Sequence, residues 1–105
     1  MKRRDAMVMA GAAALLAVGA AQAQDVGVTA TEILLGEVQP MSGPASLIGK
    51  AGAAGSKLAI AEINAAGGIN GRKLRAIYED DGYVPSRSVS AVKKLIDSDK
   101  VFALT

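Results

Sequence analysis

The fold is decided by the apolar stretch ILLGEV, residues 33–38, and by the two segments that follow it. A near-continuous apolar run of this length is typical of a parallel strand buried on both faces. Residues 39–49 hold two prolines, two serines and two glycines and predict a loop. Residues 51–66 predict a helix that stops at Gly67 and Gly68. Strand, loop and helix form the first half of a βαβ unit, whose loop lies at the sheet edge where ligands bind.

The rest of the chain repeats this alternation of strand and helix. Residues 73–78 predict a second strand, and the polar side chains on one of its faces suit the edge of a sheet. Residues 85–98 predict a second helix, because Pro85 suits the first helical turn. Residues 101–104 predict a third strand. The sequence therefore predicts an α/β fold, a parallel sheet in the order β-α-β-α-β with right-handed crossovers.

Helical spacing of small and apolar residues predicts the buried face of each helix. In the first helix these residues are Gly52, Gly55, Ser56, Ala59, Ile60 and Ile63. In the second helix they are Val89, Val92, Leu95 and Ile96. The small residues of the first set predict a close approach of the helix backbone to the sheet.

Composition excludes several classes of function. The chain has 105 residues, enough for at most one domain, and contains neither cysteine nor histidine. Disulfides, thiolate metal sites and the commonest general base are therefore absent. The formal charge of +2 lies entirely in the first five residues, because residues 24–105 hold nine basic and nine acidic side chains (12 − 3 and 10 − 1). With no basic stripe in the body of the chain, we expect no nucleic-acid partner.

Three adjacent carboxylates, Glu79, Asp80 and Asp81, are the only candidates for a metal or an acid–base site. Their spacing does not suit a calcium loop, which needs alternating ligands and a distant glutamate. Their polar, glycine-containing context also argues against the shifted pKa values that catalysis requires. We therefore expect a protein that is not an enzyme and that has no metal and no cofactor.

Residues 1–23 have the three parts of a secretory signal peptide. A basic start precedes an uncharged apolar run over residues 6–21, expected to be helical, and AQA at residues 21–23 fits a cleavage site between Ala23 and Gln24. An uncleaved membrane anchor and twin-arginine export are the alternatives. The expected location of the mature protein is the periplasm.

Several motifs resemble one known family. They are MSGP at residues 41–44, INAAGGINGRKL at 63–74, DDGY at 80–83, KKLI at 93–96 and VFAL at 101–104. Residues 31–105 resemble the N-terminal end of the solute-binding proteins of ABC transporters, of the leucine/isoleucine/valine-binding type, which have the type I periplasmic binding fold. Residues 24–105 would then be the truncated N-terminal part of lobe 1.

The resemblance implies that a small polar ligand, such as an amino acid, is captured between two lobes and delivered to an ABC permease in the membrane. Ser42 and Ser46, through their hydroxyl groups, and Ile48, through an apolar contact, are the candidate ligand-binding residues, although both serines also suit turns and helix caps. Family members often carry an aromatic residue where this chain has Ile48, and commonly an aspartate where it has Val84. The aspartates of the DDGY motif match a family pattern that looks mainly structural.

Two other functions are consistent with the same sequence: a ligand-sensing receptor domain of this fold, and a truncated product without function. Residues 24–105 alone are expected to be unstable or oligomeric. Their third strand would present an open edge, and open apolar edges promote aggregation.

Overall fold

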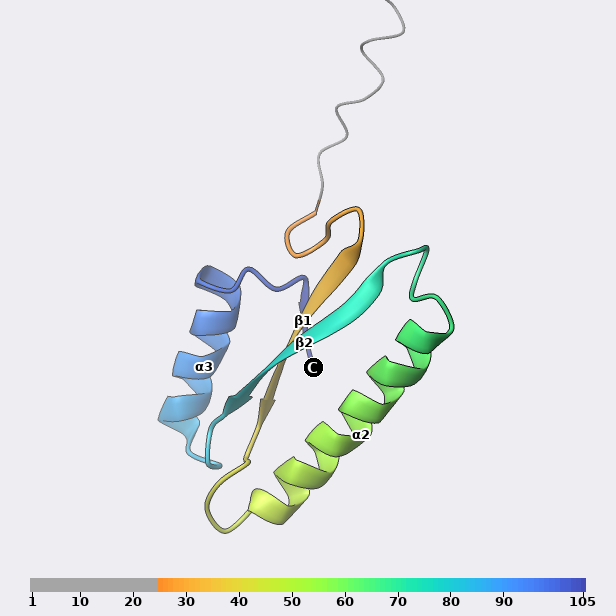
Figure 1. The fold of residues 1–105 in the computed structure, drawn as a ribbon. Coiled ribbons are helices and arrows are strands. Elements are labelled where there is room, and N and C mark those ends of the chain that lie inside the picture. The colour runs from red at the N-terminus through yellow and green to blue at the C-terminus, as the bar shows by residue number, and fades with distance from the viewer. Residues whose placement is uncertain (1–24) are drawn as a thin grey trace, which may run out of the picture.

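The computed structural model describes residues 25–105 as three parallel strands and two helices. The elements are β1 (Glu32–Gln39), α2 (Ser46–Ala65), β2 (Lys73–Asp80), α3 (Pro85–Asp97) and β3 (Ala103–Leu104) (Figure 1). The α/β fold and its β-α-β-α-β order are confirmed. The predicted signal peptide and its cleavage site between Ala23 and Gln24 lie outside the described residues. Within residues 25–105, neither helix combines the length and hydropathy that a membrane span requires.

β1 is the middle strand of the sheet, whose order is β2-β1-β3. It pairs in parallel with β2 from Glu32 opposite Lys73 to Gln39 opposite Asp80. β3 pairs with the middle of β1 on the other side, with Gly36 opposite Leu104. β1 is thus the central strand of the described sheet. β2 is an edge strand of this described sheet, as its mixed polarity predicts.

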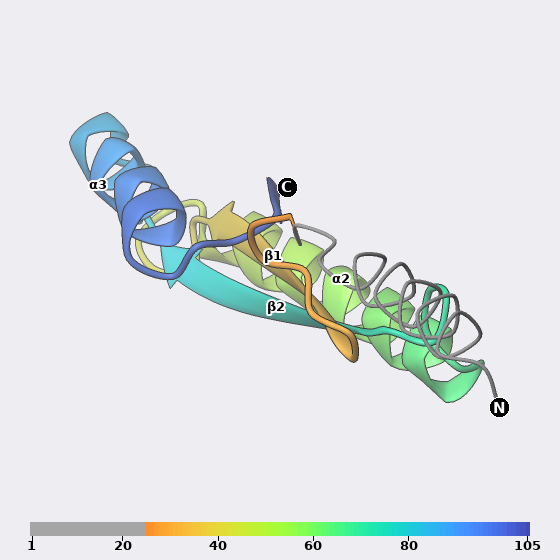
Figure 2. The ribbon, with the colours of Figure 1, turned by 90° about the horizontal axis from the view of Figure 1, so that it is seen from above.

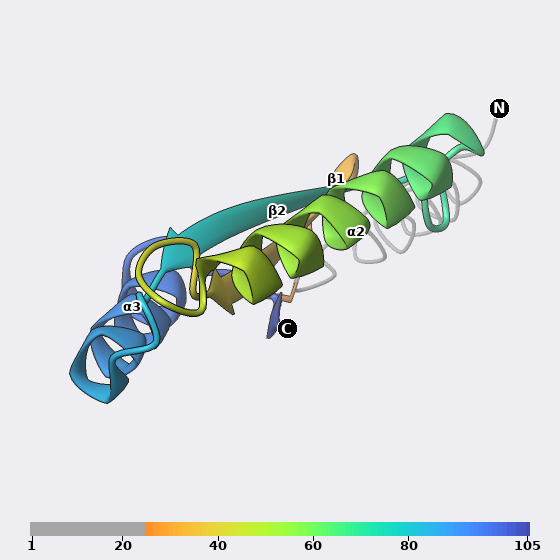
Figure 3. The same ribbon diagram turned by 90° about the horizontal axis from the view of Figure 1, so that it is seen from below.

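The two helices cover opposite faces of the sheet. Gly36 faces α3, because a Cβ atom placed on it would lie 3.0 Å from the Leu95 side chain. Gln39 lies three positions further along β1, faces the other side, and approaches Gly52 of α2. The strands pass between the helices in Figure 1. α2 lies behind the strands when seen from above (Figure 2) and in front of them from below (Figure 3).

The core of the described residues is small. Its buried apolar side chains are Ala53, Ala91, Leu95 and Val101. Leu95 is fully buried, and it fits over β1 because Gly36 has no side chain. The predicted burial of Leu95 is therefore correct, and the sheet face beneath α3 is the better-filled half of the core.

The first helix differs from the prediction in its start and in its buried face. α2 begins at Ser46 instead of residue 51, so the predicted loop over residues 39–49 ends early. The buried and half-buried positions are Ser46, Gly49, Ala53, Ser56, Ile60 and Asn64. The prediction is right for Ser56 and Ile60 and wrong for four exposed residues, Gly52, Gly55, Ala59 and Ile63.

Contacts at both ends of α2 explain why its buried face differs from the predicted one. At the start, Gly49 lies so close to the end of β1 that a Cβ atom would stand 2.1 Å from the Pro40 carbonyl oxygen. Near the other end, the Asn64 side chain donates to the Leu74 carbonyl and accepts from the Leu74 N–H, both at 2.8 Å. Because of these two contacts, the helix face that runs from Gly49 to Asn64 packs against the sheet.

The second helix also buries a different line of residues. Val92 is half-buried as predicted, but Val89 and Ile96 are 62% and 50% exposed. Ser88 and Ala91 take the inward positions instead, because the Ser88 hydroxyl donates to the Asp81 carboxylate at 2.6 Å and orients the first turn.

The second and third strands differ from their predicted bounds. β2 runs two residues beyond residue 78, to Asp80, so two of the three adjacent carboxylates belong to the strand. β3 is only Ala103–Leu104, and the buried Val101 precedes it.

Candidate functional site

The candidate site lies at the carboxyl ends of β1 and β2. These strands end side by side, with Gln39 opposite Asp80. The β1–α2 loop, residues 40–45, and the β2–α3 loop, residues 81–84, both leave this edge. In open parallel sheets, ligands bind in the crevice beyond this end of the strands. The local geometry of the two loops therefore decides what can bind.

The Asp80 carboxylate joins the two loops. Its Oδ1 atom accepts hydrogen bonds from the backbone N–H groups of Met41 at 2.8 Å, Ser42 at 3.1 Å and Gly82 at 2.8 Å. The Ser42 side chain first, and then these N–H groups, lower the pKa of Asp80 from 3.8 to about 2. The residue is therefore a charged acceptor that fixes the β1–α2 loop against the β2–α3 loop.

The Asp81 carboxylate organises the start of α3. Its Oδ2 atom accepts from the Ser88 hydroxyl at 2.6 Å and its Oδ1 atom from the Tyr83 N–H at 2.9 Å. The Ser88 hydroxyl, followed by the Tyr83 N–H, lowers the pKa of Asp81. Val84 is the N-cap residue of α3 and makes no side-chain cap bond. Asp81 stabilises this helix start from the preceding loop instead.

Both aspartates thus act as hydrogen-bond acceptors for the protein itself, as the resemblance implied. Within residues 25–105, no group of three potential ligand side chains gathers closely enough to hold a metal ion.

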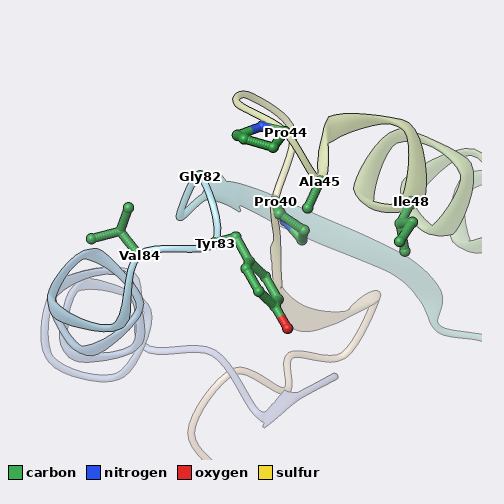
Figure 4. A pocket seen from close by; sticks show the side chains of 7 residues that line it. All are labelled: Pro40, Pro44, Ala45, Ile48, Gly82, Tyr83 and Val84. Atoms are coloured by element: carbon green, nitrogen blue, oxygen red, sulfur yellow. The ribbon is translucent and has the colours of Figure 1, made fainter.

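An apolar hollow of about 720 Å³ opens between the two loops. It is lined by Pro40, Pro44, Ala45, Ile48, Gly82, Tyr83 and Val84 (Figure 4). Ile48 of α2 and Tyr83 of the β2–α3 loop stand on either side of Pro40 in this view. Their side chains remain open to solvent, with Ile48 74% and Tyr83 76% exposed. The hollow therefore offers apolar contact on one side and is uncovered on the other.

The three predicted ligand-binding residues lie in different places. Ile48 lines the hollow, but Ser42 and Ser46 are not among its lining residues. Ser42 lies between the loops, where its hydroxyl would be 3.3 Å from a Cβ atom on Gly82. Ser46 is the first residue of α2, whose N-cap is Ala45 and which has no side-chain cap bond. The structure thus brings Ile48 to the hollow and leaves ligand contact by the serines a prediction.

Of the seven lining residues, sequence reasoning named only Ile48 as a site candidate, and Tyr83 is the aromatic residue among those it missed. The sequence analysis included Tyr83 only as the last residue of the DDGY motif. A usable signal was present, because Tyr83 is one of only three aromatic residues and follows Gly82 just beyond a strand expected to end at the ligand edge. Its exposure, however, depends on the conformation of the loop.

Comparison with known proteins gives the same fold and a family. A family model described as "Periplasmic binding protein" matches residues 32–105, which is more than half of the chain. The chain belongs to the periplasmic binding protein family. Its resemblance to the leucine/isoleucine/valine-binding type of ABC solute-binding protein is confirmed by its relatives.

Two sequence relatives illustrate this membership. An amino acid binding protein of Pseudomonas aeruginosa is 34% identical over 73 residues, covering 70% of this chain and 20% of that protein. The leucine-specific-binding protein of Salmonella typhimurium is 35% identical over 97 residues, covering 92% of this chain and 24% of that protein. This periplasmic binding protein chain therefore spans about a fifth to a quarter of the length of these relatives.

Two solved structures with the same fold are substrate-binding proteins of transporters. A fatty acid ABC transporter substrate-binding protein from Thermomonospora curvata has a TM-score of 0.70 and 32% identity, covering 78% of this chain and 21% of that one. The branched-chain amino acid transporter substrate binding protein from Streptococcus pneumoniae, in complex with isoleucine, has a TM-score of 0.68 and 32% identity. That match covers 70% of this chain and 21% of the other.

Proposed function

We propose that residues 24–105 are the N-terminal part of lobe 1 of an exported solute-binding protein for an ABC importer. The protein captures a small polar ligand, such as an amino acid, between two lobes and delivers it to a membrane permease. Membership of the periplasmic binding protein family supports this proposal. Residues 1–23 act as the signal peptide, cleaved between Ala23 and Gln24, and the mature protein works in the periplasm.

The observation that carries the proposal is the hollow at the carboxyl edge of β1 and β2. Asp80 fixes the two loops that form it, yet Ile48 and Tyr83 remain mostly exposed. Small-molecule sites usually bury about 70–90% of their ligand. A one-sided hollow needs a second wall to reach that burial, and capture between two lobes supplies one.

The residues at this edge fit the binding of a ligand better than the catalysis of a reaction. The hollow is lined by proline, alanine, isoleucine, glycine, valine and one tyrosine, and the nearby aspartates are occupied by backbone N–H groups and by Ser88. The hydroxyl groups of Ser42 and Ser88 at this edge bind carboxylates whose pKa is lowered, and such carboxylates are weak general bases. We therefore propose a solute receptor and no catalytic function.

The test is a binding measurement on the mature gene product, purified from a periplasmic extract. Its intact mass shows whether residues 1–23 have been removed. Isothermal titration with the twenty amino acids then measures affinity, and we expect at least one Kd at or below about 10 μM. Absence of binding to all twenty contradicts the ligand class, and retention of residues 1–23 contradicts cleavage of the signal peptide.

A further inference from the structure

Asn70 and Gly71 form the tight turn between α2 and β2, a segment to which the proposed function gives no role. Their φ angles are +50° and +77°. The residues on either side are paired, because the Ile69 N–H donates to the Arg72 carbonyl at 2.7 Å and the Arg72 N–H donates to the Ile69 carbonyl at 2.9 Å. This is the two-residue turn that an Asn-Gly pair favours. It precedes the first residue of β2 and so lies at the end of the sheet away from the hollow (Figure 1).

Two groups of this turn that can react with each other are free. Asn70 and Gly71 are both exposed, and within residues 25–105 neither the Asn70 side-chain amide nor the Gly71 N–H makes a hydrogen bond. A Cβ atom placed on Gly71 would have nothing within 4 Å, and glycine has no side chain of its own to shield its nitrogen. The Gly71 nitrogen is therefore open to approach by the Asn70 side chain and by water.

Asn64, the only other asparagine of the chain, has the opposite surroundings. Its half-buried side chain donates to the Leu74 carbonyl and accepts from the Leu74 N–H, both at 2.8 Å. The next residue, Ala65, is the last of α2, so its N–H points back along the helix. The two asparagines thus differ in the freedom of the side-chain amide and in the freedom of the nitrogen that follows it.

We infer that Asn70 is a site of spontaneous deamidation, through attack of the Gly71 backbone nitrogen on its side-chain carbonyl carbon. A bond forms between the Gly71 nitrogen and Asn70 Cγ, and the bond from Cγ to Nδ2 breaks. The amide group leaves as ammonia, which takes the proton of the Gly71 N–H. Water then opens the cyclic imide at one of its two carbonyl groups. One opening gives aspartate, and the other gives isoaspartate, in which the main chain runs through Cβ and Cγ.

The isoaspartate product disrupts the turn. It lengthens the main chain between Ile69 and Gly71 by one carbon atom, so the two hydrogen bonds between Ile69 and Arg72 cannot both keep their geometry. The same turn positions the Arg72 side chain, which donates to the Thr29 carbonyl at 2.7 Å. Deamidation therefore loosens the connection between α2 and β2 as the protein ages. This inference is independent of the proposed function.

The test follows both asparagines in the mature gene product during storage in mildly alkaline buffer. Mass spectrometry of proteolytic peptides detects replacement of the amide NH2 by OH, and fragment ions distinguish isoaspartate from aspartate. Free peptides of residues 61–67 and 66–73, stored alongside, give the rate of each asparagine without the fold. Asn70→Gln is the resistant variant, because its longer side chain would have to close a larger ring. Asn70→Asp carries the charge of the product on an ordinary main chain.

We expect Asn70 in the protein to react no more than about tenfold more slowly than in its peptide, because a surface turn opens at little cost. Asn64 should be slowed at least about a hundredfold relative to its own peptide, because the helix and two hydrogen bonds hold it. Asn70→Gln should show no conversion at residue 70. The isoaspartate form, separated by chromatography, should unfold at a lower temperature than both the unmodified protein and Asn70→Asp.

Three results would overturn the inference. The first is an Asn70 that stays unconverted in the protein while its peptide reacts, because the turn would then protect it. The second is equal slowing of Asn64 and Asn70, because the free turn would then make no difference. The third is an isoaspartate form that unfolds at the same temperature as the unmodified protein, because the turn would then tolerate the longer main chain.

Discussion

Asp80 shows at the scale of one residue how the site is held together. Its carboxylate accepts three backbone N–H groups, two from the β1–α2 loop and one from Gly82 of the β2–α3 loop. The Ser42 side chain, and after it these backbone donors, favour the charged form, so the pKa of Asp80 falls to about 2 in the folded protein. The geometry of the hollow consequently depends on the charge of this one residue.

A pH dependence of stability follows from Asp80. A group whose pKa is lower in the folded state stabilises the fold above its unfolded pKa, and this stabilisation is lost as the pH falls through the folded pKa. We expect the unfolding midpoint of the mature protein to drop as the pH falls from about 4 to about 2, and to drop less steeply in Asp80→Asn. Urea unfolding at several pH values measures this difference. Asp97→Asn, an exposed aspartate at the end of α3, is the control, and equal slopes for Asp80→Asn and the unmodified protein would contradict the prediction.

The predicted role of Ser42 is also tested at this scale. If its hydroxyl donates to the ligand, Ser42→Ala should weaken amino acid binding about three- to tenfold, the equivalent of one neutral hydrogen bond. Ser46→Ala tests the second serine in the same titration. Unchanged affinity would make Ser42 a loop residue that supports Asp80 and makes no ligand contact.

At the scale of elements, α2 is positioned by its approach to the end of β1. Gly49 is buried against Pro40, whereas Gly55, less than two turns later, has nothing within 4 Å of the position where a Cβ atom would lie. Both glycines lie in the same helix, and both lower its intrinsic propensity. Only the first has a packing reason for being glycine.

The two glycines form a matched pair of substitutions. Gly49→Ala should destabilise the protein by about 1–3 kcal/mol, because the new Cβ atom would force α2 away from the Pro40 carbonyl. Gly55→Ala should stabilise it by up to about 1 kcal/mol, because it adds helix propensity without a clash. Urea unfolding of both variants measures the difference. Equal effects of the two substitutions would contradict the packing argument.

At the scale of the whole molecule, the described residues leave much apolar surface uncovered. β3 pairs with β1 on one side, and within residues 25–105 no strand pairs with its other edge. Phe102 and Leu104 at this edge are exposed, as are Leu47 and Leu58 on α2. Small domains also bury a smaller fraction of their surface than large ones, which makes them marginally stable.

We therefore expect residues 24–105, expressed alone, to self-associate or to unfold without a cooperative transition. Size-exclusion chromatography with light scattering measures the mass, and circular dichroism follows thermal unfolding. A monomer with a sharp transition would contradict this expectation. Charged substitutions at the edge, Phe102→Lys and Leu104→Lys, should reduce self-association if the open edge causes it.

The sequence by itself determined the order of strands and helices, the parallel sheet and the family, because hydrophobic periodicity, glycine and proline positions and short motifs are properties of neighbouring residues. It also indicated the sheet edge that carries the hollow and one residue of its lining, Ile48. Only the tertiary structure decided the rotation of α2, the buried line of α3, the role of Asp80 and the exposure of Tyr83. Each of these depends on contacts between segments far apart in the chain, such as the hydrogen bond between Met41 and Asp80 across 39 positions, and local sequence patterns carry no record of such contacts.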